Sequence, residues 1–283
     1  MNTEDVKLIQ GRPWSTTFQH LIDLFRPEGG LAELQPDPEH DPVTKYIVEI
    51  ICVLDIPIFF LGRISPSRGL WGEFRGVQST WSEGQLHGVE PISGLPRSLL
   101  DIISRCHDDS GNAERELWQW PGEVSQWFHD CHLWDCYRFA CILSIRRQHL
   151  QNLCGHSMDA ESSERINTET NVPETSLVLF RLLSCLSALL DESEGQQARP
   201  FQIQRLALFP IVQASLQVSL LKAQVEWREA LKRMRDRILA LDRGPTHQTV
   251  LLFEILDEAW ESGSDEFDAV GAARRRGGEF TIF

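Results

Sequence analysis

Apolar side chains recur at helical spacing along almost the whole chain. Near its beginning, Trp14, Phe18, Leu21, Ile22 and Phe25 step by four, three, one and three residues, which places them on one face of a helix. Alternation of apolar and polar residues, the pattern of a strand, never lasts more than a few positions. The pattern therefore predicts an all-α protein, an irregular multi-helix bundle of about eight to ten helices.

The first half of the chain is predicted to form a buried helix, a loop and a shorter helix. Residues 43–61 are apolar nearly all round, as in a central helix, and Pro57 is expected to kink or end it. Residues 62–94 are rich in glycine and hold no period, which indicates a loop with short helical pieces. The next helix is expected to start at Leu95-Pro96. Three aromatic side chains are expected to pin the loop to the core: Trp71, Phe74 and Trp81.

The second half is predicted to form further helices around one polar segment. Residues 155–173 are polar and without a period, which indicates a surface loop. Apolar density is similar on both sides of it, so residues 1–283 are expected to form a single domain, and 155–173 is where that domain would subdivide. The helical patterns cover 113–153 with a break at Pro121-Gly122, 174–190, 201–221 with a break at Pro210, 225–241 and 248–260.

The charge of the chain bears on its partners. The 27 basic and 41 acidic side chains leave a formal net charge of -14, while 42% of the residues are apolar, enough for a sizeable core. A surface this acidic repels phosphate backbones over much of its area. Direct DNA binding by this chain alone is therefore disfavoured, whereas a protein partner is compatible with the charge.

The seven cysteines indicate a reducing compartment. Their number is odd and most of them lie within apolar helical stretches, so free buried thiols are expected. Cys131, Cys136 and Cys141 recur every five residues and therefore scatter around a helix axis. A binuclear zinc cluster begins with two cysteines separated by two residues, and no pair in the chain has that spacing. No zinc cluster is expected.

No segment predicts export or membrane insertion. The first residues lack a basic stretch followed by an apolar one, so no signal peptide is expected. The most apolar segment, Tyr46–Leu61, carries Glu49 and Asp55 and is shorter than the ~20 apolar residues that a membrane helix needs. We expect no association with a membrane.

The sharpest candidate for a metal site is the set His129, His132 and Cys136. Spacings of three and four residues place the three side chains on one helix face, and zinc accepts nitrogen and sulfur ligands. One helix rarely completes a tetrahedral site, however, and the neighbouring Trp127 and Trp134 indicate that this helix mainly packs. A buried, hydrogen-bonded histidine pair is favoured, and neither a metal nor a cofactor is expected.

Signatures of catalysis are weak. Neither Gly-rich phosphate-binding motif occurs, and Gly155–Asp159 resembles a nucleophile elbow but has Asp159 where the second glycine is needed. An all-α metal-dependent enzyme is one alternative function, because paired acidic side chains bind Mg²⁺. The nearest pairs are Asp108-Asp109 and Asp265-Glu266, both beside loop residues at helix ends. We expect a protein that is not an enzyme.

Two basic groups have ordinary structural interpretations. The helix at 225–241 has an apolar stripe, and its cations are expected to form a solvated face above that stripe: Lys222, Arg228, Lys232, Arg233, Arg235 and Arg237. Near the end of the chain, Arg274, Arg275 and Arg276 are a candidate nuclear localisation patch, although the end of a surface helix explains them better.

Several short segments follow one another in a recognisable order. They are Trp14–Gly30, Tyr46–Arg63 with Leu70-Trp71, Gly94-Leu95-Pro96 before Leu99–Ile103, Leu206–Pro210, Leu256–Trp260, Phe267–Val270 and Arg276–Phe280. As an ordered set they resemble the effector region of fungal-specific zinc-cluster transcription factors. The chain departs from that family at Gln213-Ala214-Ser215, where Ala-Gly is common, and at Phe267, which stands in place of a tryptophan.

The resemblance implies a nuclear transcriptional regulator or co-regulator. In that family the region is an all-α platform without enzymatic activity that regulates activation, including that of metabolic and secondary-metabolite gene clusters. The expected partners are proteins, namely a zinc-cluster transcription factor or a co-activator. Because this chain has no zinc cluster, DNA binding does not carry over to it.

A small-molecule-binding helical module is the second alternative function. The aromatic-rich helix Trp118–Phe139 would line an apolar pocket, although core packing explains the same aromatic side chains equally well.

Overall fold

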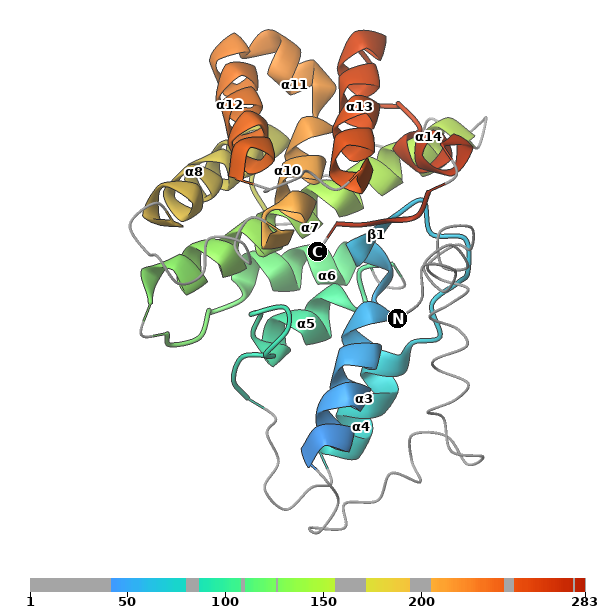
Figure 1. The fold of residues 1–283 in the computed structure, drawn as a ribbon, viewed down its shortest axis with the longest axis vertical. Coiled ribbons are helices and arrows are strands. Elements are labelled where there is room, and N and C mark those ends of the chain that lie inside the picture. The colour runs from blue at the N-terminus through green and yellow to red at the C-terminus, as the bar shows by residue number, and fades with distance from the viewer. Residues whose placement is uncertain are drawn as a thin grey trace, which may run out of the picture. The chain divides into compact units, whose positions relative to one another are not determined.

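The computed structural model describes residues 42–79, 87–107, 110–125, 127–155, 172–193, 205–241, 247–276 and 278–282. Within these ranges the chain forms eleven α-helices, one 3-10 helix and one two-stranded sheet, so the prediction of an all-α multi-helix protein is confirmed (Figure 1). The residues divide into two units. Unit 1 comprises residues up to His87 together with Ala269–Thr281, and unit 2 comprises Gly88–Asp268 with the last two residues.

Unit 1 combines an early segment and a late segment of the chain. Helix α3 packs against α4, strand β1 pairs with β2, and α14 contacts β1. The sheet is antiparallel, with Phe60 opposite Thr281 and Leu61 opposite Phe280. The elements are α3 (Pro42–Leu54), the 3-10 helix η2 (Pro57–Phe59), β1 (Phe60–Leu61), α4 (Leu70–Gln78), α14 (Ala269–Arg275) and β2 (Phe280–Thr281).

The predicted central helix ends earlier than the pattern indicated. Helix α3 stops at Leu54, and residues up to Leu61 form η2 and β1 instead. Pro57 is the physical reason, because its ring disfavours helical backbone at the preceding residue. Ile56 accordingly has an extended backbone, with φ -64° and ψ 119°. The expectation that Trp71 and Phe74 pin the next segment to the core is confirmed, since both are buried on α4.

Asp55 ties the segment between β1 and α4 to the end of α3. Its carboxylate is 1% exposed and forms an ion pair with Arg63 at 2.8 Å. Arg63 also donates to the Asp55 backbone carbonyl at 2.7 Å, and Ser67 Oγ donates to Asp55 Oδ2 at 2.8 Å. The backbone amides of Arg68 and Leu70 complete the set at 2.9 and 3.1 Å. Every oxygen of this buried carboxylate is therefore hydrogen-bonded, as a buried charge requires.

Gly62 lies where the late segment passes close to the early one. Arg274 of α14 donates to the carbonyls of Gly62 and Arg63, and the Ile64 amide donates to Glu279. Gly62 has φ +83°, and a Cβ atom on it would come within 2.8 Å of both the Ala273 Cβ and the Gly278 carbonyl oxygen. Only glycine fits this position without movement of the late segment.

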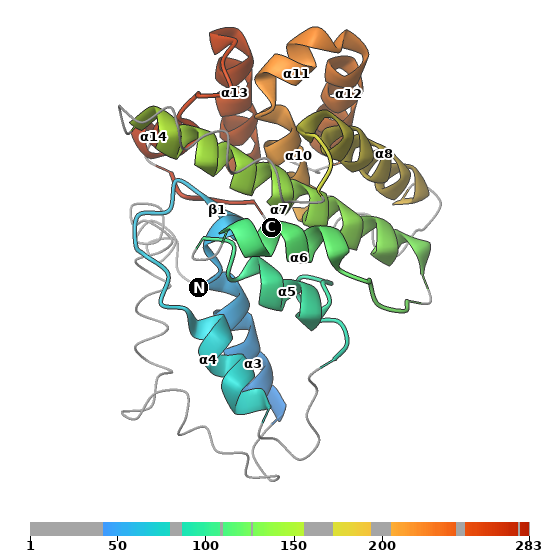
Figure 2. The ribbon, with the colours of Figure 1, turned by 180° about the vertical axis from the view of Figure 1, so that it is seen from behind.

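Unit 2 is built around one long helix. In both views α7 passes between α5 and α6 on one side and α8, α10, α12 and α13 on the other (Figures 1 and 2). Helices α5, α6, α8 and α10 each contact α7 directly. The helices are α5 (Arg97–Ile103), α6 (Ser110–Gln119), α7 (Phe128–Gly155), α8 (Thr175–Ser193), α10 (Leu208–Ser215), α11 (Val218–Ala223), α12 (Val225–Leu241) and α13 (His247–Ser262).

The middle of α7 is buried on all sides. From Phe139 to Ile145 every side chain is almost fully buried, which explains why no single apolar stripe marks this helix. Its aromatic side chains make specific contacts: the Trp134 Nε1 donates to the Gly94 carbonyl at 2.8 Å, and the Tyr137 ring lies 5.4 Å from that of Phe209 in α10.

The predicted breaks of the helical pattern have two outcomes. The break at Pro121-Gly122 is confirmed, since α6 ends at Gln119 and α7 begins at Phe128. The break expected at Pro210 falls three residues earlier: residues 205–206 are helical, Ala207 is a turn, and α10 begins at Leu208. Pro210 is the third residue of α10, and a helix tolerates proline in its first turn, where the N–H has no partner within the helix. The chain turns again at Leu216 and Gln217, between α10 and α11.

Three other expectations concern residues outside the described ranges. These expectations are the helix predicted from Trp14 to Phe25, the role of Trp81 and most of the polar loop at 155–173. The helices on either side of that loop, α7 and α8, belong to the same unit. The single-domain organisation of residues 1–283 stays a prediction.

The close approach at Gly62 generates a prediction about unit 1. We expect Gly62→Ala to lower the free energy of unfolding by roughly 2–4 kcal/mol, because the new methyl combines positive-φ strain with a clash against backbone. Gly69 has φ +69° and open space around a Cβ, so Gly69→Ala should cost only about 1 kcal/mol. Gly72→Ala, in α4 with no atom within 4 Å of the new methyl, should stabilise slightly.

Urea unfolding of the three variants measures this order. Equal effects for Gly62→Ala and Gly69→Ala would show that the late segment is not packed against Gly62.

Candidate functional site

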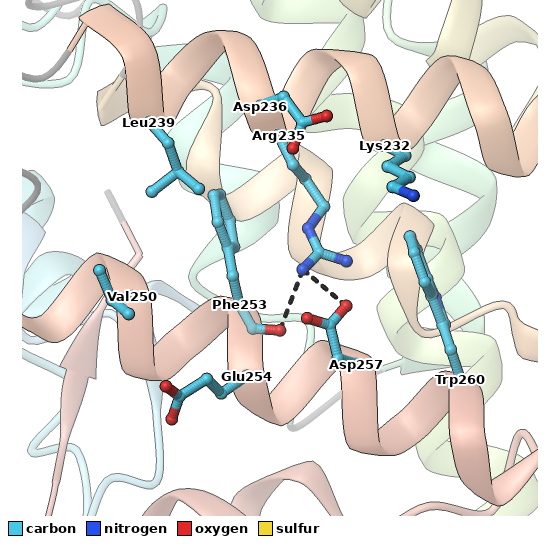
Figure 3. A pocket seen from close by; sticks show the side chains of 9 residues that line it. All are labelled: Lys232, Arg235, Asp236, Leu239, Val250, Phe253, Glu254, Asp257 and Trp260. Carbon is cyan, nitrogen blue, oxygen red and sulfur yellow. Dashed lines mark hydrogen bonds and ion pairs between the residues drawn. The ribbon is translucent and has the colours of Figure 1, made fainter.

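The candidate site is a hollow between α12 and α13, which we call the α12–α13 groove. The two helices contact each other and run in opposite directions in the close view (Figure 3). The hollow has a volume of about 230 Å³. Its lining residues are Lys232, Arg235, Asp236 and Leu239 of α12, and Val250, Phe253, Glu254, Asp257 and Trp260 of α13.

Three hydrogen bonds within unit 2 hold the C-terminal end of α13 in place. Trp260 Nε1 donates to the Ser215 carbonyl at 2.8 Å, and Asp265 accepts from the Ser219 amide at 2.8 Å. Arg147 of α7 donates to the Phe267 carbonyl, and burial lowers the pKa of Arg147 to about 10. The Trp260 ring, which forms one wall of the groove, is therefore fixed in position.

Arg235 lies at the base of the groove between two aromatic rings. Its guanidinium carbon is 4.8 Å from the centre of the Phe253 ring and 4.6 Å from that of Trp260, within cation–π range. Its Nη2 donates to the Phe253 carbonyl at 3.0 Å and to Asp257 Oδ1 at 2.8 Å (Figure 3). Asp257 itself is 56% exposed, so this ion pair reaches from the interior to the solvent.

The burial of Arg235 corrects the prediction of a fully solvated cationic face. Arg235 is only 6% exposed, whereas Arg228, Lys232 and Arg233 are exposed as expected. A signal for this was present in the sequence. Arg235 follows Leu231 by four residues and precedes Ile238 by three, which places it on the border of the apolar stripe. Helical periodicity alone could not show that rings from α13 would accept the cation.

Two nitrogens of Arg235 are left without a partner. Among the described residues nothing accepts from its Nε or its Nη1, although both are buried. A buried donor without a partner costs about 1–3 kcal/mol. The groove therefore contains a cation whose hydrogen-bonding capacity the fold uses only in part.

The rim of the groove carries exposed charges of both signs. Lys232 is the basic one, and Arg228, which does not line the hollow, has its guanidinium 5.3 Å from the centre of the Trp260 ring. In the part of the chain that the structure describes, neither forms an ion pair. Asp236 and Glu254 are the acidic ones, and both line the hollow. The groove thus combines an apolar wall with opposite charges at its mouth.

The predicted metal candidates do not assemble into a site. His129 Nε2 lies 3.2 Å from Asp130 Oδ1, and the His129 ring stacks on Trp127 with centroids 6.0 Å apart. His132 is half-buried, while Cys136 is fully buried and burial raises its pKa well above the ordinary value. Across the described ranges, no three His, Cys, Asp or Glu side chains are grouped so that they could hold a metal ion.

Of the acidic pairs weighed for Mg²⁺, Asp265-Glu266 lies within the described residues, and it belongs to no group there that could hold a metal ion. Asp265 caps the first turn of α11 through the Ser219 amide, and the Glu266 amide donates to Ser264 Oγ at 3.1 Å. Asp108-Asp109 and most of Gly155–Asp159 lie outside the described residues.

The arginine cluster near the end of the chain lies at the end of a helix. Arg274 and Arg275 are in the last turn of α14, and Arg276 follows it. Arg274 and Arg275 are exposed, although Arg274 is engaged by the carbonyls of Gly62 and Arg63. A role of these arginines in nuclear localisation stays a prediction.

Most aromatic side chains of the segment Trp118–Phe139 pack against other rings, whereas Trp127 and Phe128 are 57% and 81% exposed. Trp118 lies 6.2 Å from Phe139, and Trp120 meets Trp134 edge-on at 6.2 Å. None of these side chains lines the α12–α13 groove. Core packing, the simpler of the two interpretations of this segment, is therefore the one that its ring contacts support.

A second surface of interest joins α8 and α12, and we call it the α8–α12 aromatic surface. It consists of Phe180 and Trp227, with Leu177 three residues before Phe180 on α8 and Val225 at the start of α12. Phe180 is 50% exposed, and its ring lies 5.9 Å from the half-buried ring of Trp227. Leu177 and Val225 are exposed as well. Exposed apolar side chains contributed by two helices are typical of a contact surface for a protein.

Comparison with known proteins gives no relatives: no family model, no curated protein and no solved structure matches the chain. Among the described helices, none combines the length and the apolar character needed to cross a membrane.

The thiols generate a prediction about reactivity. Of the described cysteines Cys131 alone is exposed, while burial raises the pKa of Cys136, Cys141 and Cys52 well above the ordinary value. In a Cys154→Ser background, we expect a disulfide reagent to modify Cys131 rapidly in the native protein, the half-buried Cys185 more slowly because burial raises its pKa to about 11, and the others only after unfolding. The pKa of Cys131 is raised by partial burial and then by Asp130 and Asp135, so its rate should still be rising above pH ~8.5.

Adding Cys131→Ser should abolish the rapid phase. Two or more thiols reacting at the rapid rate would contradict the burial described here.

The environment of Arg235 generates a prediction about stability. Arg235→Met keeps the bulk between the two rings and removes the unpartnered donors, so we expect the free energy of unfolding to change by no more than about 1 kcal/mol. Arg235→Ala should lower it by roughly 2–4 kcal/mol, because the space between Phe253 and Trp260 is left unfilled. Denaturant unfolding compares the two variants. If methionine costs as much as alanine, the charge of Arg235 stabilises the fold and its packing does not.

Proposed function

We propose that the protein is a nuclear transcriptional regulator or co-regulator that acts through protein contacts. The proposal is supported by the ordered resemblance to the effector region of fungal zinc-cluster transcription factors, and the all-α architecture agrees with it. The net charge of -14 favours recruitment to chromatin by a partner over direct DNA binding.

The observation that carries the protein-contact part of the proposal is the α8–α12 aromatic surface. Interface energy concentrates in a few large apolar and aromatic side chains, and Phe180 and Trp227 supply two in contact with each other. The proposed partner is a full-length zinc-cluster transcription factor, which would supply the DNA-binding cluster that this chain lacks. In that arrangement this chain contributes a contact platform and the partner contributes sequence recognition.

Chromatin immunoprecipitation of the tagged protein tests the proposal. The wild type should be recruited to promoters only in cells that contain the zinc-cluster partner. Phe180→Ser should lower the recruitment several-fold, because the substitution removes an exposed apolar contact from the α8–α12 aromatic surface. Phe128→Ser is the matched control, since Phe128 is 81% exposed at the start of α7 and belongs to no part of that surface.

Recruitment that does not need the partner would overturn the proposal. An equal loss with Phe180→Ser and Phe128→Ser would count against the α8–α12 aromatic surface, provided that both variants unfold at the same denaturant concentration as the wild type.

A further inference from the structure

We propose that the α12–α13 groove binds a small zwitterionic amino acid with an apolar side chain. This inference goes beyond the proposed regulatory function and does not depend on it, since it rests on the groove alone. Three features carry it: the arrangement of charges, the apolar wall, and the partly unused guanidinium of Arg235.

The charges of the groove favour a ligand that carries both signs. Asp257 and Arg235 neutralise each other through their 2.8 Å ion pair. The charges left in the lining are Lys232, which is basic, and Asp236 and Glu254, which are acidic. The lining therefore carries charges of both signs, and a zwitterion meets an opposite charge for each of its ends.

The charges are also separated in space. Figure 3 shows Lys232 and Trp260 at one end of the groove and Glu254 with Val250 at the other. The carboxylate of the ligand would lie near Lys232 and Arg228, beside the Trp260 ring. Its ammonium group would face Glu254, and Asp236, which is on the same rim as Lys232, would add to the negative potential at the mouth.

The wall of the groove suits an apolar side chain. Leu239 and Val250 are half-buried, and Phe253 presents its ring beside them (Figure 3). The hollow of about 230 Å³ is smaller than the roughly 300–1,000 Å³ typical of pockets for drug-sized ligands, so it suits a small ligand. Burying the ligand's side chain against these residues would supply the apolar part of the binding energy.

The environment of Arg235 is a second, independent observation that supports a binding site in the groove. It is more than nine-tenths buried, its guanidinium points across the base of the groove, and its Nε and Nη1 have no partner among the described residues. A fold that needed only packing here would be served by an apolar side chain of the same bulk. A cation in this place instead leaves two buried N–H groups that the described residues do not use.

Isothermal titration calorimetry on the full chain tests the proposal. The probes are leucine, phenylalanine, phenylalaninamide, which has no carboxylate, and 3-phenylpropionate, which has no amine. We expect at least one of the two amino acids to bind, and both single-charge analogues of phenylalanine to bind roughly five- to tenfold more weakly than phenylalanine.

Two variants assign the two ends of the ligand, and a third serves as the control. Lys232→Gln should weaken binding of the amino acid but leave phenylalaninamide unchanged, whereas Glu254→Gln should weaken the amino acid but leave 3-phenylpropionate unchanged or improved. Arg233→Gln is the control, because Arg233 is an exposed cation of α12 that does not line the groove. All three changes are at exposed positions, so none is expected to unfold the protein.

Two results would overturn the proposal. One is the absence of binding by both leucine and phenylalanine up to their solubility limits. The other is binding that responds equally to Lys232→Gln and Arg233→Gln, which would reflect general charge and not the groove.

Discussion

The burial of α7 on all sides is the constraint on which unit 2 depends. A helix whose middle turns carry only side chains excluded from water must be covered by several neighbours at once, and α5, α6, α8 and α10 are those neighbours. Helix α12 then packs on α8 and α10, and α13 on α10 and α12. The α12–α13 groove and the α8–α12 aromatic surface both depend on this order of packing, since each includes α12, which packs on the helices that cover α7.

The two buried charges Asp55 and Arg235 differ in how completely the protein satisfies their hydrogen bonds. Asp55 has every oxygen occupied, by Arg63, Ser67 and two backbone amides, and its role is complete within unit 1. Arg235 has one nitrogen occupied and two without a partner in the described part of the chain. Both side chains are removed from water, so the difference lies in how many of their hydrogen-bonding atoms have a partner within the protein. An incomplete environment of this kind is typical of positions where something other than stability was selected.

Helical periodicity predicted much of this fold and little of the site. The bounds of α12 agree with the predicted 225–241, and the division between α6 and α7 falls at Pro121-Gly122, because these features depend on local spacing and local backbone chemistry. The β1–β2 pair could not be foreseen, since each strand is two residues long and its partner comes from the other end of the described chain. To predict the groove, one would have to know which face of α13 meets Arg235, and tertiary packing decides this.

The composition of unit 1 has a consequence for the order of assembly during synthesis. Residues 42–79 emerge from the ribosome early, but α14 and β2, which complete this unit, are made only after all of α5 to α13. Unit 2 draws almost all of its residues from one continuous stretch and can collapse as that stretch emerges. Through that interval β1 has no strand to pair with and Gly62 no segment to pack against it. Until α14 and β2 have been made, β1 is therefore an unpaired strand edge that other chains can contact.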